Sequence, residues 1–179
     1  MNFEETYIKG TFLVTPQVFG DSRGYFCETF NQREFEKHIC RVEFIQDNES
    51  QSSRGVLRGL HFQKGEYAQA KLVRVICGAV LDVAVDIRRD SPTFGKHFAV
   101  ELSAENKRQL FIPRGMAHGF AVLRDNTVFA YKVDNIYSPA NESGIRYDDP
   151  DLAIDWRLPR AELLLSEKDK RLEYFGNIF

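Results

Sequence analysis

Residues 76–97 read ICGAVLDVAVDIRRDSPTFGKH. Every second residue from Leu81 to Ile87 is apolar and branched, and the positions between them carry aspartate or alanine. This alternation places the two sets on opposite faces of an extended strand. Residues 90–95 (DSPTFG) then signal a turn, and the apolar alternation resumes over residues 98–102. The stretch therefore predicts two neighbouring β-strands.

Similar short runs recur on both sides of this stretch, separated by turn signals. We expect further strands on the flanks of residues 54–75 and over 6–15, 25–29, 42–48, 108–113, 119–123 and 127–134. Many short strands with turns between them predict an all-β sandwich or barrel. A chain of 179 residues can bury a sizeable core, and we expect residues 1–179 to form a single domain.

Helices are expected to be short, peripheral and mainly near the C-terminus. Asn31, with Glu34 three residues later, predicts a helix over residues 32–40, whereas residues 49–55 (ESQSSRG) look like a polar connection. Three prolines make residues 138–159 irregular, and helical patterns begin near Pro159 and Ser166. The apolar ending, YFGNIF, should dock on the core or on another subunit.

Composition narrows the function classes. The formal net charge is −2, so no global basic field points to nucleic acid. No apolar run reaches membrane-spanning length, and the N-terminal residues carry no signal-peptide pattern. The odd number of cysteines, three, argues against a disulfide framework. We therefore expect reduced, buried thiols in a cytoplasmic protein.

The chemistry is concentrated in residues 54–75, RGVLRGLHFQKGEYAQAKLVRV, which place His61 among five arginine and lysine side chains. Histidine can exchange a proton near neutral pH, and a nearby cation can hold the charge that develops when a C–H proton is removed. Lys71 shares its strand parity with Val73 and Val75, which favours a lysine that faces a pocket.

Several long motifs in the same order resemble the dTDP-4-dehydrorhamnose 3,5-epimerase family of the cupin superfamily. They are DSRGYFCETFN, QDNESQSSRGVLRGLHFQ, KLVRVICGAVLDVAVDIRRDSPTFGK, FIPRGMAHGFAVL, YKVDNIYSP, GIRYDDPDLAIDW and LSEKDKRL. The resemblance implies a jelly-roll β-sandwich and a homodimer. It also implies inversion of C3 and C5 of a dTDP-4-keto-6-deoxyhexose on the way to dTDP-L-rhamnose, without a cofactor, because the C4 ketone already serves as the electron sink.

The resemblance also implies roles for particular residues. His61 would be the base, Asp169 would hydrogen-bond its imidazole, Lys71 would face the developing oxyanion, and Tyr131 would be the acid on the opposite face. The substrate-binding residues that it implies are Arg23, Glu28, Gln46, Asn48, Arg58, His118, Tyr137, Glu142 and Lys168.

Cupins that use a metal place two histidines one residue apart, and here His61-Phe62-Gln63 lacks the second. The PRGMAH run (113–118) adds one histidine, which does not complete a ligand set. We therefore expect no catalytic metal.

Each role has a structural alternative. Asp169 follows Ser166 at the spacing of a helix-start carboxylate, and His118 could be a purely structural histidine. Tyr137 competes with Tyr131 for the acid role, with packing on the sugar or base as its other use. Strict alternation puts Arg58 and His61 on opposite faces unless Gly59 forms a β-bulge.

Other functions remain open at this stage. A relative could epimerise one carbon only, or isomerise a related dTDP-keto sugar. A cupin could bind a sugar nucleotide without turnover, and a metal-dependent oxygenase is the most distant option. A proline that often follows the Lys-Asp pair in the family is replaced here by Leu172-Glu173-Tyr174, which changes how the tail would pack.

Overall fold

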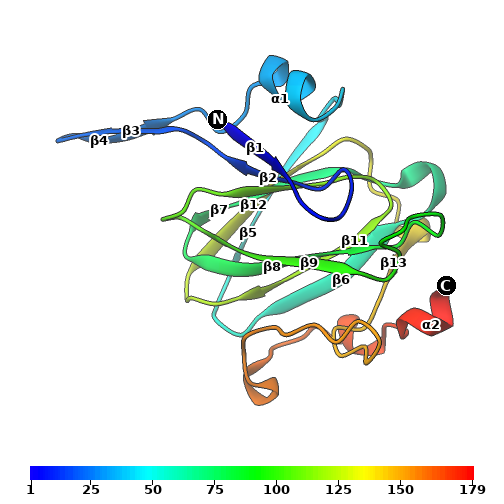
Figure 1. Ribbon diagram of the computed structural model, residues 1–179. Coiled ribbons are helices and arrows are strands. Elements are labelled where there is room, and N and C mark those ends of the chain that lie inside the picture. The colour runs from blue at the N-terminus through cyan, green and yellow to red at the C-terminus, as the bar shows by residue number, and fades with distance from the viewer.

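Two antiparallel sheets pack face to face in the computed structural model, which describes residues 1–179 (Figure 1). The six-stranded sheet has the order β1 (Asn2–Glu5), β2 (Phe12–Thr15), β10 (Gln109–Ile112), β7 (Lys71–Cys77), β12 (Thr127–Val133) and β5 (Gln46–Ser52). The five-stranded sheet has the order β13 (Glu142–Gly144), β6 (Leu57–Gln63), β11 (Met116–Val122), β8 (Ala79–Asp86) and β9 (His97–Ser103). The predicted β-sandwich is confirmed.

The inner faces of the two sheets enclose an apolar core. Side chains from both sheets meet there, among them Val73 and Phe129 from the six-stranded sheet and Val80 and Phe120 from the five-stranded one. Leu81, Val83 and Val85 point the other way, into a second core cluster. Strand β8 is therefore buried on both faces, and the predicted alternation separates two cores rather than core and solvent.

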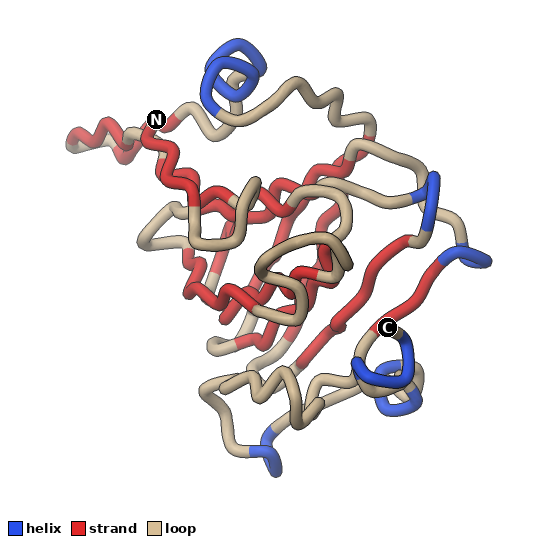
Figure 2. Tube along the Cα trace, turned by 45° about the vertical axis from the view of Figure 1, so that its right-hand side comes forward, coloured by secondary structure: helices blue, strands red, loops and turns tan.

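The C-terminal segment covers the outer face of the five-stranded sheet (Figures 1 and 2). It consists mostly of loops with two 3-10 turns, η3 (Arg160–Glu162) and η4 (Asp169–Arg171), and it ends in helix α2 (Phe175–Ile178). Phe175 and Phe179 pack against the outer core cluster, and the Trp156 indole donates to the carbonyl of Tyr147 at 2.8 Å. The apolar ending, YFGNIF, docks on the core of its own chain. This was one of the two outcomes expected from the sequence, the other being docking on another subunit.

Helix α1 (Gln32–His38) covers part of the outer face of the six-stranded sheet. The Asn31 side chain accepts hydrogen bonds from the backbone amides of Arg33 and Glu34, at 3.1 and 3.2 Å, which confirms the predicted N-cap. Phe35, 1% exposed, anchors the helix among the rings of Phe44 and Phe111.

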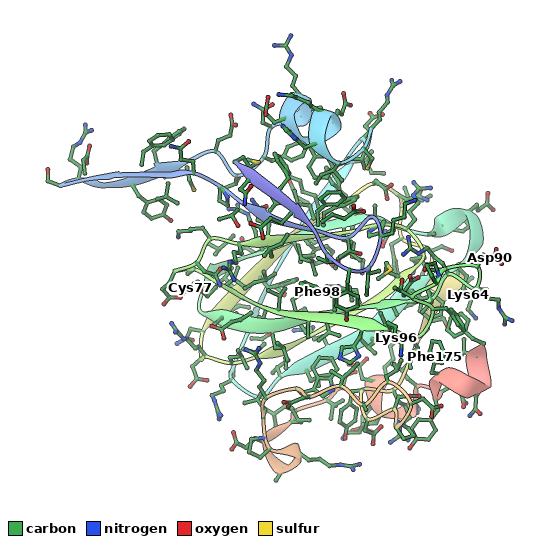
Figure 3. The ribbon with its side chains drawn as sticks, viewed as in Figure 1. Lys64, Cys77, Asp90, Lys96, Phe98 and Phe175 are labelled. Carbon is green, nitrogen blue, oxygen red and sulfur yellow. The ribbon has the colours of Figure 1, made fainter.

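A two-stranded hairpin, β3 (Val18–Asp21) and β4 (Gly24–Cys27), extends away from the sandwich (Figure 1). Its side chains project into open space on both sides (Figure 3). Phe19 and Phe26 are 56% and 69% exposed. An isolated hairpin is marginally stable by itself, and large exposed aromatic groups mark an interaction surface.

Two strand predictions near the N-terminus were wrong in their bounds. Residues 6–11 form a turn between β1 and β2 instead of the first half of a strand. Residues 42–45 form a loop, and β5 combines the last three residues of the predicted strand, 46–48, with residues 49–52 of the predicted polar connection. Val42 and Phe44 are apolar because they pack beside Phe35, whereas β5 is a polar edge strand and carries no apolar pattern.

Three further expectations need correction. Residues 138–159 include a 3-10 turn, η2 (Pro139–Asn141), and strand β13, so the stretch is not wholly irregular. The helical patterns near Pro159 and Ser166 yield only 3-10 turns. The three cysteines are free, but Cys40 and Cys77 are exposed rather than buried.

Helices are short and lie at the periphery of the strands (Figure 2). None of them has the length and apolar character that crossing a membrane requires.

Candidate active site

A cavity of about 510 Å³ opens into the sandwich between the two sheets. Side chains from both sheets and from the C-terminal segment line it. It brings together seven of the residues singled out from the sequence, namely Asn48, Arg58, His61, Lys71, His118, Tyr131 and Asp169. An adjoining lobe of about 330 Å³ shares Asn48, His61, Lys71 and Tyr131, and it adds Gln46, Tyr137 and Glu142.

Strand β6 bulges at Gly59, as predicted. His61 pairs with His118 and Arg58 pairs with Phe120, so Gly59 and Leu60 together lie opposite the single residue Gly119. The extra residue changes the strand parity and lets Arg58 and His61 line the same cavity. Gly59 has a φ of +114°, a conformation that L-residues rarely adopt.

His61 is paired with Asp169 across 108 residues of sequence, with 2.6 Å between Nε2 and Oδ1. Because a carboxylate can only accept, the imidazole hydrogen lies on Nε2, and Nδ1 keeps a lone pair that can take a proton. Burial by itself would raise the pKa of Asp169. The hydrogen bond and the charge of His61 have a larger combined effect, so the pKa of Asp169 lies below its ordinary value. Asp169 is 3% exposed, so solvent does not compete for the imidazole.

The turn that carries Asp169 is fixed from two directions. The Ser166 hydroxyl accepts the Asp169 backbone amide at 3.1 Å, so the predicted helix-start contact exists beside the histidine contact. After the turn, Leu172 packs where a Cβ on Gly144 would stand, and Arg146 donates its backbone amide to the Glu173 carbonyl at 2.9 Å. Leu172-Glu173-Tyr174, where the sequence departs from the family pattern, therefore pack on β13. The pairing of His61 with Asp169, the dyad, is preserved.

Lys71 begins strand β7 and faces the cavity on the same side as Val73, as its parity predicts. Its Nζ lies 5.9 Å from the centre of the Tyr131 ring. Burial lowers the pKa of Lys71 to about 8, although the charges of Asp82 and Glu142 oppose that change. The ammonium is thus poorly solvated and well placed to interact with a developing anion.

Tyr131 lies on β12 opposite Asn48 on one side and Val73 on the other. Burial raises the pKa of its phenol, with the charge of Arg58 acting in the opposite direction, so the hydroxyl keeps its proton at neutral pH. Tyr137 is different, because it is 52% exposed and donates its hydroxyl to Glu142 Oε2 at 2.5 Å. Of the two tyrosines, Tyr131 is therefore the one whose phenol is half-buried and has no hydrogen-bond partner.

Glu142 anchors the adjoining lobe. Besides the bond from Tyr137 it forms an ion pair with Lys168, with 2.5 Å between Oε2 and Nζ. Burial raises the pKa of Glu142, but the hydrogen bonds from Lys168 and Tyr137 outweigh it and lower that pKa overall. Lys168, predicted as a substrate-binding residue, thus reaches the edge of the site through this carboxylate.

His118 is buried at the back of the cavity, and its Nε2 donates to Asp82 Oδ2 at 2.9 Å. Burial lowers the pKa of His118, and Asp82 only partly compensates. The neighbouring Phe129 ring stacks on Phe120, with 4.1 Å between centroids, and forms an apolar floor.

Three predicted substrate-binding residues line neither the cavity nor its lobe. Lys168 still contacts Glu142 at the edge, whereas Arg23 and Glu28 lie elsewhere. Arg23 is at the tip of the β3–β4 hairpin, its side chain 88% exposed and paired with Asp21. Glu28 follows the hairpin and accepts a hydrogen bond from Asn31 at 3.1 Å. They lie outside the chain's own cavity because the hairpin extends away from the sandwich (Figure 1).

Sequence reasoning did not single out several lining residues, among them Ser50, Phe120 and Phe129. It noted Asp82 only as part of a strand face, although an aspartate in the middle of an apolar strand is a usable signal for a buried functional group. No group of three or more His, Cys, Asp or Glu side chains is placed to hold a metal ion.

The chain matches the family model described as dTDP-4-dehydrorhamnose 3,5-epimerase over residues 5–177. It is 56% identical to the dTDP-4-dehydrorhamnose 3,5-epimerase of Escherichia coli (strain K12), over 96% of this chain and 93% of that protein. Against the protein of the same name from Methanothermobacter thermautotrophicus the identity is 52%, over 94% of this chain and 91% of that one.

Solved structures agree with these matches. A 3,5-epimerase from Legionella pneumophila, in complex with dTDP-4-keto-L-rhamnose, superposes with a TM-score of 0.95 at 47% identity, covering 99% of this chain and 94% of that one. A 3'-monoepimerase from Streptomyces bikiniensis, in complex with dTDP-quinovose, gives a TM-score of 0.90 at 32% identity, covering 97% and 87%. The predicted cupin jelly roll is confirmed, and the chain belongs to the dTDP-4-dehydrorhamnose 3,5-epimerase family of carbohydrate epimerases.

Proposed function

We propose that this enzyme inverts C3 and C5 of dTDP-4-dehydro-6-deoxy-D-glucose to give dTDP-4-dehydro-L-rhamnose, within dTDP-L-rhamnose biosynthesis. Four groups of the kinds that this reaction needs share one cavity, and the proposal rests on that placement. They are an imidazole, its carboxylate partner, an ammonium and a phenol, from His61, Asp169, Lys71 and Tyr131.

The hydrogens on C3 and C5 are acidic because both carbons are next to the C4 ketone. His61 removes one of them through Nδ1, and Asp169 holds the ring and supports the imidazolium that forms. The electron pair of the broken C–H bond moves toward O4 and gives an enolate. Lys71 stabilises the negative charge on O4, since a poorly solvated ammonium interacts strongly with an anion.

Inversion requires that the new proton arrive on the opposite face of the carbon. Tyr131 supplies it from the β12 side, while His61 acts from the β6 side. The raised pKa of the Tyr131 phenol keeps the proton available at neutral pH, and no hydrogen bond ties its hydroxyl to Glu142 as it does for Tyr137. His61 then releases its proton to solvent and Tyr131 takes one up from solvent, after which the second carbon follows the same sequence of steps.

The dTDP moiety is held by side chains around the chemistry. Arg58 donates from a planar guanidinium that suits a diphosphate, and Asn48, Gln46 and Glu142 offer polar groups in the cavity and its lobe. Tyr137 packs on the sugar or the base, and its half-exposed ring supports this. His118 closes the back of the site.

The active enzyme is a cytoplasmic homodimer in this proposal. The hairpin carries Arg23 away from its own cavity and exposes Phe19 and Phe26, which suits a segment that reaches a second copy. Arg23 and Glu28 would then contribute to substrate binding in the partner's cavity. The three free cysteines are compatible with a reducing compartment.

Incubation with dTDP-4-keto-6-deoxyglucose in D₂O tests the reaction. We expect deuterium at both C3 and C5, read by NMR, together with the L-rhamno product. Label at one carbon only would identify a single-carbon epimerase and contradict the proposal. Binding of the dTDP-sugar without exchange or turnover would identify a non-catalytic binding protein.

A further inference from the structure

Asp82 is a buried carboxylate that the proposed proton transfers do not use. It is 0% exposed and lies in β8 between Val80 and Ala84, two residues of the inner core. Its Oδ2 accepts a hydrogen bond from His118, but its Oδ1 has no hydrogen-bond partner. A buried carboxylate oxygen without a partner is costly, so the surroundings must offer some compensation.

Lys71 supplies a complementary charge. Burial and the charges of two carboxylates shift the pKa of its ammonium, and no hydrogen bond contributes to that shift. Of these carboxylates Asp82 has the larger effect, ahead of Glu142. The two groups without a matched partner, Asp82 Oδ1 and Lys71 Nζ, therefore face the same interior from opposite sheets.

The other carboxylates near the chemistry are already engaged. Glu142 binds Lys168 and Tyr137, and Asp169 binds His61. Asp82 differs because its oxygen without a hydrogen-bond partner is fully buried. The charged or titratable groups that surround the Lys71 ammonium, from all the elements packed around it, are Glu49, Arg58, His61, Asp82, His118, Tyr131, Tyr137, Glu142 and Asp169.

We infer that Asp82 is a positioning residue whose buried negative charge keeps Lys71 protonated in the cavity, so that an ammonium is present where the enolate oxygen forms. This inference rests on the proposed function, since it assigns Asp82 a task in that reaction. His118 holds the carboxylate in place through Oδ2 and leaves Oδ1 for the charge interaction.

The direction of the pH effect follows from the sign of the charge. Burial lowers the pKa of Lys71 to about 8, and the Asp82 charge opposes that change. Without the charge the pKa of Lys71 falls further. Activity that needs the ammonium declines as pH rises through this pKa, so the alkaline limb of the pH–rate profile must move toward acid when Asp82 is neutralised.

A direct titration tests the inference without substrate. Protein labelled with ¹³C at the lysine ε-carbon gives a Lys71 resonance, which is assigned by its loss in Lys71→Arg. We expect a midpoint near 8 in the wild type and about one unit lower in Asp82→Asn. Asp90→Asn is the matched control, because Asp90 is an exposed aspartate at the edge of the molecule (Figure 3). Equal midpoints in Asp82→Asn and the wild type would overturn the inference.

The pH–rate profile gives the functional readout. For Asp82→Asn we expect the ratio of its activity to that of the wild type to fall about tenfold between pH 6 and pH 9.5, with no such fall for Asp90→Asn. A uniform loss at all pH values would mean a merely structural role and would refute the inference. If Asp82→Asn does not fold, Asp82→Ser carries the same expectation. Failure of the wild type to exchange deuterium would instead refute the proposed reaction, whatever the titration shows.

Discussion

A Cβ atom placed on Gly59 would lie 2.6 Å from the Cα atom of Gly119 on the neighbouring strand. Gly59 also has a φ of +114°, and a Cβ on Gly119 would be crowded as well, because it would lie 2.7 Å from the Arg58 carbonyl oxygen. The two glycines thus permit the close approach of β6 and β11 at the bulge that brings Arg58 and His61 to the same cavity.

Gly59→Ala should lower the free energy of unfolding by about 2–4 kcal/mol, because the new methyl group meets backbone atoms in a backbone conformation unsuited to alanine. It should also lower activity, since the bulge sets the direction of Arg58 and His61. Gly65→Ala is the control, with a φ of +57° and nothing within 4 Å of the new Cβ. Urea unfolding of both variants measures the difference, and equal losses would mean that the close approach to Gly119 is unimportant.

His61→Asn should reduce turnover about 10²–10⁴-fold, the usual effect of losing a general base. The affinity for dTDP, measured by calorimetry, should stay within about threefold, because the base does not hold the nucleotide. His38→Asn removes a histidine on the outer helix and should have wild-type turnover. Full turnover in His61→Asn would mean that another group is the base.

Tyr131→Phe should slow inversion more than deprotonation. The variant keeps His61 and Lys71, so exchange of the substrate hydrogens with D₂O should continue while the L-rhamno product forms slowly. Exchange and product are read from the same NMR sample. Tyr137→Phe should leave the ratio of exchange to inversion unchanged, and an equal loss of both rates in Tyr131→Phe would exclude Tyr131 as the reprotonating acid.

Lys71→Met should abolish most activity and still raise the free energy of unfolding by about 1–2 kcal/mol at neutral pH, because it removes a poorly solvated ammonium. The pKa of Lys71 is about 8 in the folded chain and 10.5 for an ordinary lysine. Between these values the unfolded chain binds more protons, so the wild type gains stability as pH rises.

The stability advantage of Lys71→Met should therefore be largest below about pH 8 and should shrink between pH 8 and pH 10.5. Urea unfolding at about pH 7 and pH 9.5 checks this. Lys64→Met replaces an exposed lysine and should show no such pH dependence. A constant difference between Lys71→Met and the wild type at both pH values would mean that the Lys71 ammonium is well solvated.

The paired change Phe19→Ser and Phe26→Ser should convert the proposed dimer into monomers, because it removes the aromatic surface of the hairpin. Sedimentation equilibrium gives the molecular mass, and the affinity for dTDP should fall if Arg23 acts in the partner's cavity. Leu164→Ser, which changes another exposed apolar residue, should remain a dimer. A dimer that survives the paired change would place the interface elsewhere.

The strands buried on at least one face were predictable, since alternation marks them directly. Strand β8 and the Asn31 cap are examples in which the local pattern and the fold agree. Strand β5 was predicted only in its first three residues, 46–48. Its residues, QDNESQS, are polar because it is the edge strand of its sheet, and its position is set by pairing with β12.

The site was predictable to the extent that its residues lie in motifs. His61 and Lys71 stand out because of their cationic and apolar neighbours, and the Gly59 bulge follows from the parity conflict at Arg58. No local rule could pair residue 61 with residue 169, or show that Arg23 extends away from its own cavity, because both depend on the tertiary path of the chain.

The pairing of His61 with Asp169 spans 108 residues, and Asp169 comes after all the strands of both sheets in the sequence. The strands that carry His61, Lys71 and Tyr131 all leave the ribosome before it. A nascent chain can thus complete its two sheets and still lack the carboxylate that orients the imidazole. In the proposed mechanism, the dyad is completed only after the strands of both sheets have been synthesised, when η4 packs against β6.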